Sequence, residues 1–330
     1  MLFASLEFSE KRLCMLYAPC YAASFKCIAD KCKNSCCAQL EIEVDGDTLL
    51  RYEALCEPQR TKILDTVNKT AEGAVFFTDC YKRCLNLNKD GLCRIILECG
   101  EGYLCDICRE HPRFYNSFSC RSSHGAYQRC EMGLGMACEA AVALILESEN
   151  YSDIRAYGED SFTDCGEFAE SEVDILAERE RIYGMLSERG VSSLDKINSI
   201  LKLYSVNIDK IDDATVLETY FSLEYLDLSH RELFFGYKSN PNVPASFDIY
   251  LERFFAYLIY RYLPYASDSC ELSTYVGLSA LLTRLFASLM LSCKDKYECY
   301  DMARIISCEI EYSIDNIDEI IFLIDAFAKG

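Results

Sequence analysis

Histidine is scarce in this sequence, and tryptophan is absent. Only His111, His124 and His230 occur, and no Gly-x-Ser-x-Gly turn accompanies them to present a nucleophilic serine. Hydrolysis by a serine–histidine pair is therefore not predicted. His111 could ligate a metal ion, but its position between Glu110 and Pro112 also fits a structural turn.

Basic residues are few relative to acidic ones. The sequence has 33 Lys and Arg against 53 Asp and Glu, which gives a formal net charge of −20. This charge repels the phosphates of nucleic acids and the headgroups of anionic lipids. We therefore expect no nucleic-acid partner and no membrane partner, whereas the negative field would attract a lysine-bearing protein.

One long segment is nearly uncharged. The run from Leu272 to Cys293 carries Arg284 as its only charge and is long enough to cross a bilayer. However, a charge near the centre of such a segment costs about 2.5–3.5 kcal/mol on insertion scales. We therefore expect this segment to be a buried core helix.

Cysteine, in contrast, is abundant and unevenly placed. The chain has 21 cysteines, and most of them precede residue 140. The first ten residues lack the basic segment and the sustained apolar run of a signal peptide. Because disulfides persist mainly in oxidising compartments, we expect a cytoplasmic protein with reduced thiols that bind metal.

Two cysteine-rich stretches are expected to form one metal site. The first is a Cys-x4-Cys-x3-Cys-Cys run that ends at Cys37, and its two adjacent thiols point in different directions. The second contains Cys93 and the pair formed by Cys105 and Cys108. An Ala- and Leu-rich helix then brings Cys138 on its first turn, where the helix N-terminus favours a thiolate. The expected metal ligands are Cys27, Cys32, Cys36, Cys37, Cys93, Cys105, Cys108 and Cys138.

Iron–sulfur and zinc are the two alternatives for the metal. Zinc sites often use two Cys-x2-Cys pairs, and Cys105 with Cys108 is the one clean pair here. A [4Fe–4S] cluster takes four thiolates, and the expected ligands exceed what one zinc ion needs. We therefore favour a [4Fe–4S] cluster, with zinc as the alternative. The Cys-x3-Cys-x2-Cys spacing of radical S-adenosylmethionine enzymes starts at Cys32 but is not completed.

The pattern of apolar residues predicts a mainly α protein. Residues 1–149 form a small cysteine-rich α+β region, and residues 150–330 form a helical domain in which apolar residues recur at threes and fours. In the first region, alternation predicts a strand over Leu40–Val44, and an Asp-Gly turn joins strands over Cys84–Leu87 and Leu92–Leu97. Helices are predicted over Met136–Leu146, Glu170–Glu188, Ser193–Tyr204, Ala214–Tyr225, Ser246–Leu263, Ser273–Ser292 and Asp295–Phe327.

Other cysteines are expected to have structural roles. Cys14 and Cys20 lie in an apolar context near the N-terminus. A further group lies in apolar or helical contexts and is expected to be buried. Its members are Cys56, Cys165, Cys270, Cys293, Cys299 and Cys308.

Taken together, several segments resemble the flagellin lysine-N-methylase family. The cysteine run from Phe25 onward matches the spacing of that family, and Asp45 and Thr48 match its Asp-x-x-Thr helix start. The other similar segments are Gly91–Ile95, Leu104–Arg113, Ser119–Leu146 and Glu309–Asn316. The resemblance covers nearly the whole chain.

The resemblance implies an iron–sulfur cluster and methyl transfer from S-adenosylmethionine to lysine side chains of flagellin. Arg109 and Arg113 would then hold the carboxylate of the cofactor or balance the charge of the cluster. A lysine must lose its proton before it attacks a methyl group, and Glu139 is our candidate for the catalytic base. The alternative is a non-catalytic module, in which a zinc or iron site stabilises a helical protein-interaction domain.

Overall fold

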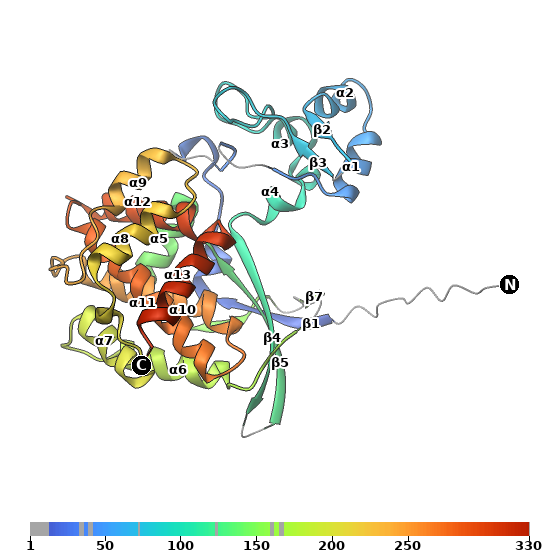
Figure 1. The fold of residues 1–330 in the computed structure, drawn as a ribbon. Helices are drawn as coiled ribbons and strands as arrows, with labels where there is room; N and C mark the ends of the chain where they lie inside the picture. The colour runs from blue at the N-terminus through green and yellow to red at the C-terminus, as the bar shows by residue number, and fades with distance from the viewer. Residues whose placement is uncertain are drawn as a thin grey trace.

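A computed structural model describes residues 13–32, 36–38, 42–71, 73–122, 125–158, 162–164 and 168–329 of the chain. It contains two lobes that each have their own cluster of buried apolar side chains (Figure 1). The large lobe comprises residues 13–24 and 113–329, and the small lobe comprises residues 42–111. Figure 1 shows the small lobe standing apart from the helical body.

The large lobe contains a mixed sheet. Its strands are β1 (Leu13–Pro19), β4 (Arg113–Ser122), β5 (Gly125–Leu134), β6 (Ile154–Ala156), β7 (Phe162–Asp164) and β8 (Ala169–Ser171). The order is β6-β1-β5-β4-β8, and β7 also pairs with β1. The long antiparallel pair β4 and β5 runs along one side of the helical body (Figure 1). The strand β1 pairs parallel with β5, with Leu16 opposite Cys130.

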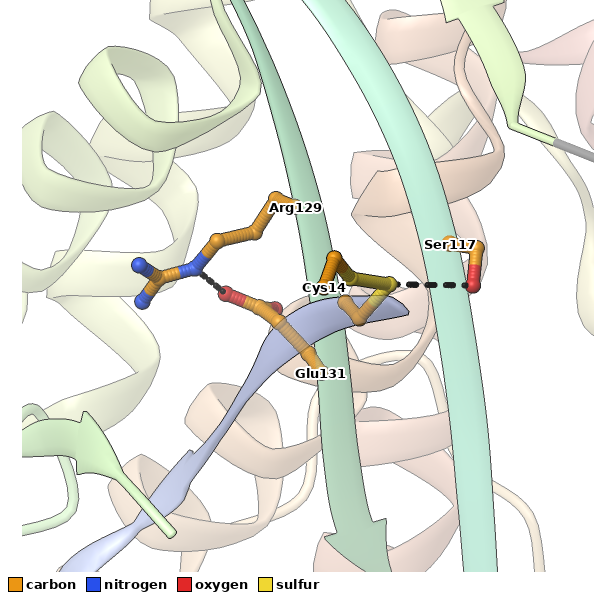
Figure 2. Close-up of a disulfide and its surroundings, with 5 residues drawn as sticks. Cys14, Ser117, Arg129 and Glu131 are labelled. Atoms are coloured by element: carbon orange, nitrogen blue, oxygen red, sulfur yellow. Dashed lines mark hydrogen bonds and ion pairs between the residues drawn. A yellow bond between two sulfur atoms is a disulfide. The ribbon is translucent and has the colours of Figure 1, made fainter. Parts of the chain in front are cut away.

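A disulfide links two strands of this sheet, and an ion pair links the sheet to a helix. A disulfide joins Cys14 of β1 to Cys130 of β5, and the Ser117 hydroxyl lies 3.7 Å from the Cys130 sulfur (Figure 2). On β5, the buried Glu131 carboxylate accepts two hydrogen bonds of 2.6 Å from the Arg179 guanidinium. Such bidentate pairs are geometrically specific, so this pair fixes the helix that carries Arg179 on the sheet.

Nine α-helices of the described chain surround the core of the large lobe. They are α5 (Glu139–Glu147), α6 (Ile175–Leu186), α7 (Ser193–Leu203), α8 (Asp213–Ser222), α9 (Leu228–Phe234), α10 (Asp248–Tyr262), α11 (Ser269–Met290), α12 (Lys296–Ile306) and α13 (Ile314–Phe327). Several begin after an aspartate whose carboxylate accepts an amide hydrogen bond, as at Asp174, Asp212, Asp227, Asp268 and Asp295. Some of the many acidic residues therefore have a structural role, because carboxylates stabilise helix N-termini.

The nearly uncharged segment forms α11. It is the one helix of the described residues that is both long enough and apolar enough to cross a membrane. However, 89% of its most apolar stretch is buried inside the protein. It packs against α10, α12 and α13. The Arg284 guanidinium reaches the Asp209 carboxylate at 2.7 Å. The expectation of a buried core helix is therefore confirmed.

The predicted helix over Asp295–Phe327 is broken into three parts. The helix α12 continues into a π-helix, η6 (Ser307–Glu311), and Ser313 then caps α13. The side chains of Cys308, Glu309 and Glu311 have different partners: the Ala137 carbonyl, His230 and Tyr257. A π-helix inserts one extra residue per turn, and this changes which faces these side chains occupy.

The small lobe is built from short elements. They are α1 (Gly46–Glu53), α2 (Gln59–Leu64), β2 (Val67–Lys69), β3 (Ala74–Phe76), α3 (Arg94–Cys99) and α4 (Asp106–Glu110). Within the small lobe, the short 3₁₀ helix η3 (Glu101–Tyr103) connects α3 to α4. The other short 3₁₀ helices of the described residues lie elsewhere in the chain: η1 (Cys20–Ser24), η2 (Ala29–Lys31), η4 (Ile208–Lys210) and η5 (Leu263–Tyr265). The apolar cluster of the small lobe has ten buried members, and two of them, Cys84 and Cys105, are cysteines.

Several local predictions are corrected here. The turn at Asn88–Gly91 exists, but the predicted strand over Leu92–Leu97 is the helix α3 from Arg94 onward. In the predicted strand over Leu40–Val44, Leu40 and Glu41 lie outside the described residues, and Glu43 makes an isolated bridge with Val75. Residues 169–171 form β8 rather than the start of a helix, because Asp174 caps α6 only later.

The predicted fold class is confirmed: the protein is mainly helical, with a small sheet and most cysteines toward the N-terminus. The two apolar clusters divide the chain differently from the boundary at residue 149. The strands β1, β4 and β5 and the helix α5 contribute to the same cluster as the C-terminal helices. The separate cluster lies within residues 42–105.

Candidate metal centre

Five thiols surround one small cavity in the small lobe. Cys37, Cys84, Cys93, Cys105 and Cys108 line a cavity of about 20 Å³, together with apolar side chains such as Ile42 and Phe76. We call these five residues the inner thiol set. A cavity of this size holds about one water-sized sphere, so a single ion fits and a four-iron cluster would require the thiols to move apart.

The helix α4 presents two of these thiols. Cys105 is its N-cap residue, and Cys108 lies one turn further on. The Cys108 thiol donates a hydrogen bond that lowers the pKa of Cys105, and the Cys108 amide acts in the same direction. The Asp45 carboxylate accepts the amides of Thr48, at 2.8 Å, and of Asp106, at 2.9 Å. One carboxylate thereby holds the N-termini of both α1 and α4.

Cys84 was not among the expected ligands, and the structure adds it. Its amide donates to the Cys37 carbonyl at 2.8 Å, which brings the two residues together. Burial raises the pKa of the Cys84 thiol to about 11, and the Asn86 amide opposes this shift. Spacing alone does not indicate this, because the Asp-Gly turn brings Leu87, rather than Cys84, opposite Cys93.

A second group of thiols lies where the cysteine run meets the large lobe. Burial raises the pKa of Cys138 to about 12, and the nearby thiols of Cys32, Cys27 and Cys308 raise it further. The thiols of Cys27 and Cys138 also contribute to the raised pKa of Cys36, after its hydrogen bond with Cys37 and its burial. We call Cys27, Cys32, Cys36, Cys138 and Cys308 the outer thiol set.

The structure thus divides the expected single site into two neighbouring sets. Of the first cysteine run, Cys37 joins the inner set, whereas Cys27, Cys32 and Cys36 join Cys138. The two sets meet where the thiols of Cys36 and Cys37 hydrogen-bond to each other. Within the described residues, no three His, Cys, Asp or Glu side chains are already arranged to hold a metal ion. Metal binding would therefore require the thiols to lose protons and to rearrange, as happens when binding is coupled to folding.

Backbone amides point at the thiols of both sets. In the inner set, amides of residues 86, 95, 96 and 108 donate toward Cys84, Cys93 and Cys105. In the outer set, the Ala29 amide lies 3.4 Å from the Cys27 sulfur, and the Ala141 amide donates toward Cys138. Hydrogen bonds of this kind favour the thiolate, which is the form that binds metal.

An open cavity of about 440 Å³ lies beside α5. It is lined by Ala140, Ala143, Leu144 and Glu147 of this helix and by Tyr21, Ser24 and Lys26 from the N-terminal region. In the sequence, Cys27 directly follows Lys26 and Cys138 lies two residues before Ala140, so both cysteines are sequence neighbours of residues that line the cavity. The volume is in the range of cavities that bind small molecules.

The remaining predicted site residues lie near these sets. The Arg109 side chain is partly exposed and already pairs with Asp106, at 2.5 Å, and with Glu110, at 3.2 Å. The Arg113 guanidinium lies over the Phe25 ring, 5.4 Å from its centroid. Glu139 is the first residue of α5 and is half-buried directly after Cys138.

The prediction that six further cysteines are buried is only partly right. Cys299 is buried, but Cys56 and Cys270 are exposed, and Cys165 lies outside the described residues. Their positions at element ends explain the exposure, since Cys56 precedes α2 and Cys270 is the second residue of α11. His111 does not line the inner cavity, and burial lowers the pKa of its imidazole.

No family model, no curated protein and no solved structure matches this chain. The resemblance to the flagellin lysine-N-methylase family therefore rests on its motifs.

Proposed function

We propose that this protein is a metal-dependent protein-lysine N-methyltransferase that uses S-adenosylmethionine in the cytoplasm. The observation that carries the proposal is the inner thiol set, in which thiols from separate chain segments line one cavity. Four thiolates are the ligands of both a [4Fe–4S] cluster and a structural zinc ion. The motifs shared with the flagellin lysine-N-methylase family favour the iron–sulfur cluster and flagellin as the substrate.

The cavity beside α5 supports a catalytic role. Its volume of about 440 Å³ suits a ligand of the size of S-adenosylmethionine, and Lys26 on its wall can pair with a carboxylate. Arg113 is better placed than Arg109 to bind that carboxylate, because the Arg109 guanidinium is already paired with two acidic side chains.

Glu139 would accept the proton of the substrate lysine. It lies on the first turn of α5, one turn before Ala143 on the cavity wall. Side chains four residues apart share a helix face. If Glu139 is the base, Glu139→Gln lowers the rate of methyl transfer about 10²-fold or more. The exposed Glu149→Gln is the matched control, and equal rates for both variants at every pH would exclude this role.

The metal assignment is tested by anaerobic purification. We expect a brown protein that contains iron and sulfide and transfers a labelled methyl group from S-adenosylmethionine to lysines of flagellin. Cys105→Ser with Cys108→Ser removes two inner ligands and should abolish the colour, whereas the exposed Cys56→Ser should leave it unchanged. An iron-loaded protein that methylates no lysine would contradict the proposed activity.

The second candidate is a non-catalytic module stabilised by metal. It is favoured by the small size of the inner cavity and by the weak apolar cluster of the small lobe, which has only ten buried members among the described residues. Small units of this kind often depend on metal for stability. A colourless protein with one tightly bound zinc ion and no methyl transfer would select this function.

A further inference from the structure

A lysine side chain occupies a site made of one carboxylate and two aromatic rings, where α5 packs against α12. The Lys296 ammonium lies 2.6 Å from a carboxylate oxygen of Glu147. Its Nζ atom also lies 5.3 Å from the ring centroid of Tyr297 and 5.9 Å from that of Tyr300. Cations are attracted to aromatic faces within about 6 Å. We call Glu147, Tyr297 and Tyr300 the ammonium site.

Contacts with neighbouring side chains hold the ammonium site in place. The Tyr300 hydroxyl donates a hydrogen bond of 2.7 Å to the Glu147 oxygen that also accepts from Lys296. The Tyr300 ring is buried and packs edge-to-face on Tyr250 of α10, with 5.6 Å between the ring centroids. The carboxylate and one of the two rings therefore have fixed positions through contacts that do not involve Lys296.

The ammonium site adjoins the open cavity beside α5. Glu147 belongs to both, because it also lines the cavity of about 440 Å³ that we assign to the methyl donor. The side chains of Lys296 and Glu147 are 42% and 49% exposed. Exposed ion pairs contribute little to stability, so an ammonium group from another molecule can replace that of Lys296 at small cost.

From these contacts we propose that the ammonium site binds a lysine side chain of the protein substrate, and that Lys296 occupies the site in the free protein. The substrate ammonium takes the place of the Lys296 ammonium, so Glu147 keeps one cationic partner throughout. The exchange makes and breaks no covalent bond. The identity of the ligand as a substrate lysine rests on the proposed function, whereas affinity for an alkylammonium group does not.

The lysine bound here differs from the lysine that is methylated. Glu139, which we assign as the base, lies eight residues before Glu147 on α5. Eight residues of α-helix span about 12 Å, so one amine cannot contact both carboxylates. The hydrogen bonds from Lys296 and Tyr300 also lower the pKa of Glu147, which makes it a poor proton acceptor. Glu147 therefore anchors a second lysine of the substrate at the edge of the cavity.

The first test measures how a fluorescein-labelled pentalysine peptide binds to the full-length protein, by fluorescence anisotropy. Lys296→Met removes the internal occupant and should lower the Kd about fivefold or more, because the apparent Kd falls when an occupied site becomes free. Lys294 is exposed and lies two residues earlier. Lys294→Met therefore controls for the change in net charge, and equal Kd values for the two variants would overturn the proposal.

Two further variants remove partners of the bound ammonium. Glu147→Gln keeps the shape of the side chain without its charge and should raise the Kd about tenfold. The matched control is the exposed Glu149→Gln, and the same Kd for both glutamine variants would contradict the proposal. Tyr297 is 67% exposed, so Tyr297→Leu should leave the fold intact and raise the Kd about threefold.

Steady-state kinetics separate this inference from the proposed function. With flagellin as the substrate, Glu147→Gln should raise KM more than it lowers kcat, since it removes binding that does not change in the transition state. Glu139→Gln should instead lower kcat. A fall in kcat at unchanged KM in Glu147→Gln would contradict the anchoring role. A wild-type protein that binds pentalysine through the ammonium site but methylates no lysine would count against the proposed function only.

Discussion

The two lobes reach stability by different means. The large lobe buries a continuous cluster of aliphatic and aromatic side chains, such as Phe254, Phe286 and Tyr260, from a sheet and many helices. The small lobe buries few apolar side chains and has five thiols around one cavity. The difference predicts that the large lobe folds through its own core, whereas the small lobe would depend on the metal proposed for its inner thiol set. This comparison leads to three predictions about the stability of each lobe.

The largest effect is expected from removal of metal. Thiolate sites contribute about 10–16 kcal/mol of apparent binding free energy in zinc-finger peptides, which exceeds what the small apolar cluster can replace. Chelation should make residues 42–111 accessible to proteases while the helices of the large lobe stay protected, as measured by limited proteolysis and circular dichroism. A small lobe that resists proteolysis after complete metal removal would show that its apolar cluster is sufficient.

A substitution confined to the large lobe should have the next largest effect. Arg179→Ala leaves the buried Glu131 carboxylate without its bidentate partner. Loss of one partner of a buried ion pair costs about 3–5 kcal/mol, measured by urea unfolding. Arg181, on the same helix, is more than half exposed, and Arg181→Ala is the matched control. Metal content should remain at the wild-type value, and its loss would mean that the lobes are not independent.

The smallest effect concerns the capping carboxylate of the small lobe. Asp45→Ala removes the cap of α1 and the acceptor for the Asp106 amide, so we expect a loss of about 1 kcal/mol. Burial raises the pKa of Asp45, but the amides of Asp106 and Thr48 outweigh it and lower the pKa overall.

This shift determines how the contribution of Asp45 depends on pH. Since its pKa is lower in the folded state, the stabilisation is complete above the unfolded pKa of about 3.9 and disappears as pH falls through the folded pKa. The difference between wild type and Asp45→Ala in thermal unfolding should therefore vanish at low pH. The exposed Asp47→Ala, which removes no cap, should show a smaller difference.

The overall helical pattern could be predicted because it depends on local rules. Apolar residues at threes and fours gave α7 and α10 to within a few residues. The break at η6 was missed, because it depends on partners that are distant in sequence: Ala137, His230 and Tyr257. The segment that forms α3 is predicted as a strand, because six residues are too few for the spacing of apolar side chains to distinguish a helix from a strand.

The thiols were identifiable from spacing, but their grouping was not. Adjacent thiols at Cys36 and Cys37 were expected to point in different directions, and the structure assigns them to different sets. Two features determine which thiols belong together: the position of α5, and the hydrogen bond from the Cys84 amide to the Cys37 carbonyl. These contacts are tertiary, so Cys84 and Cys308 could not be grouped with the others from spacing alone.

The π-helix η6 has a consequence for how the C-terminal region tolerates change. Each residue in an α-helix advances the chain by about 100° around the axis. Deletion of one residue within Ser307–Glu311 would restore the regular α-helical turn and change the relative positions of Cys308, Glu309 and Glu311 around the axis. These three side chains could then no longer reach the Ala137 carbonyl, His230 and Tyr257 together. A single-residue deletion here would thus alter the interior of the large lobe more than most substitutions, although no atom of the small lobe is touched.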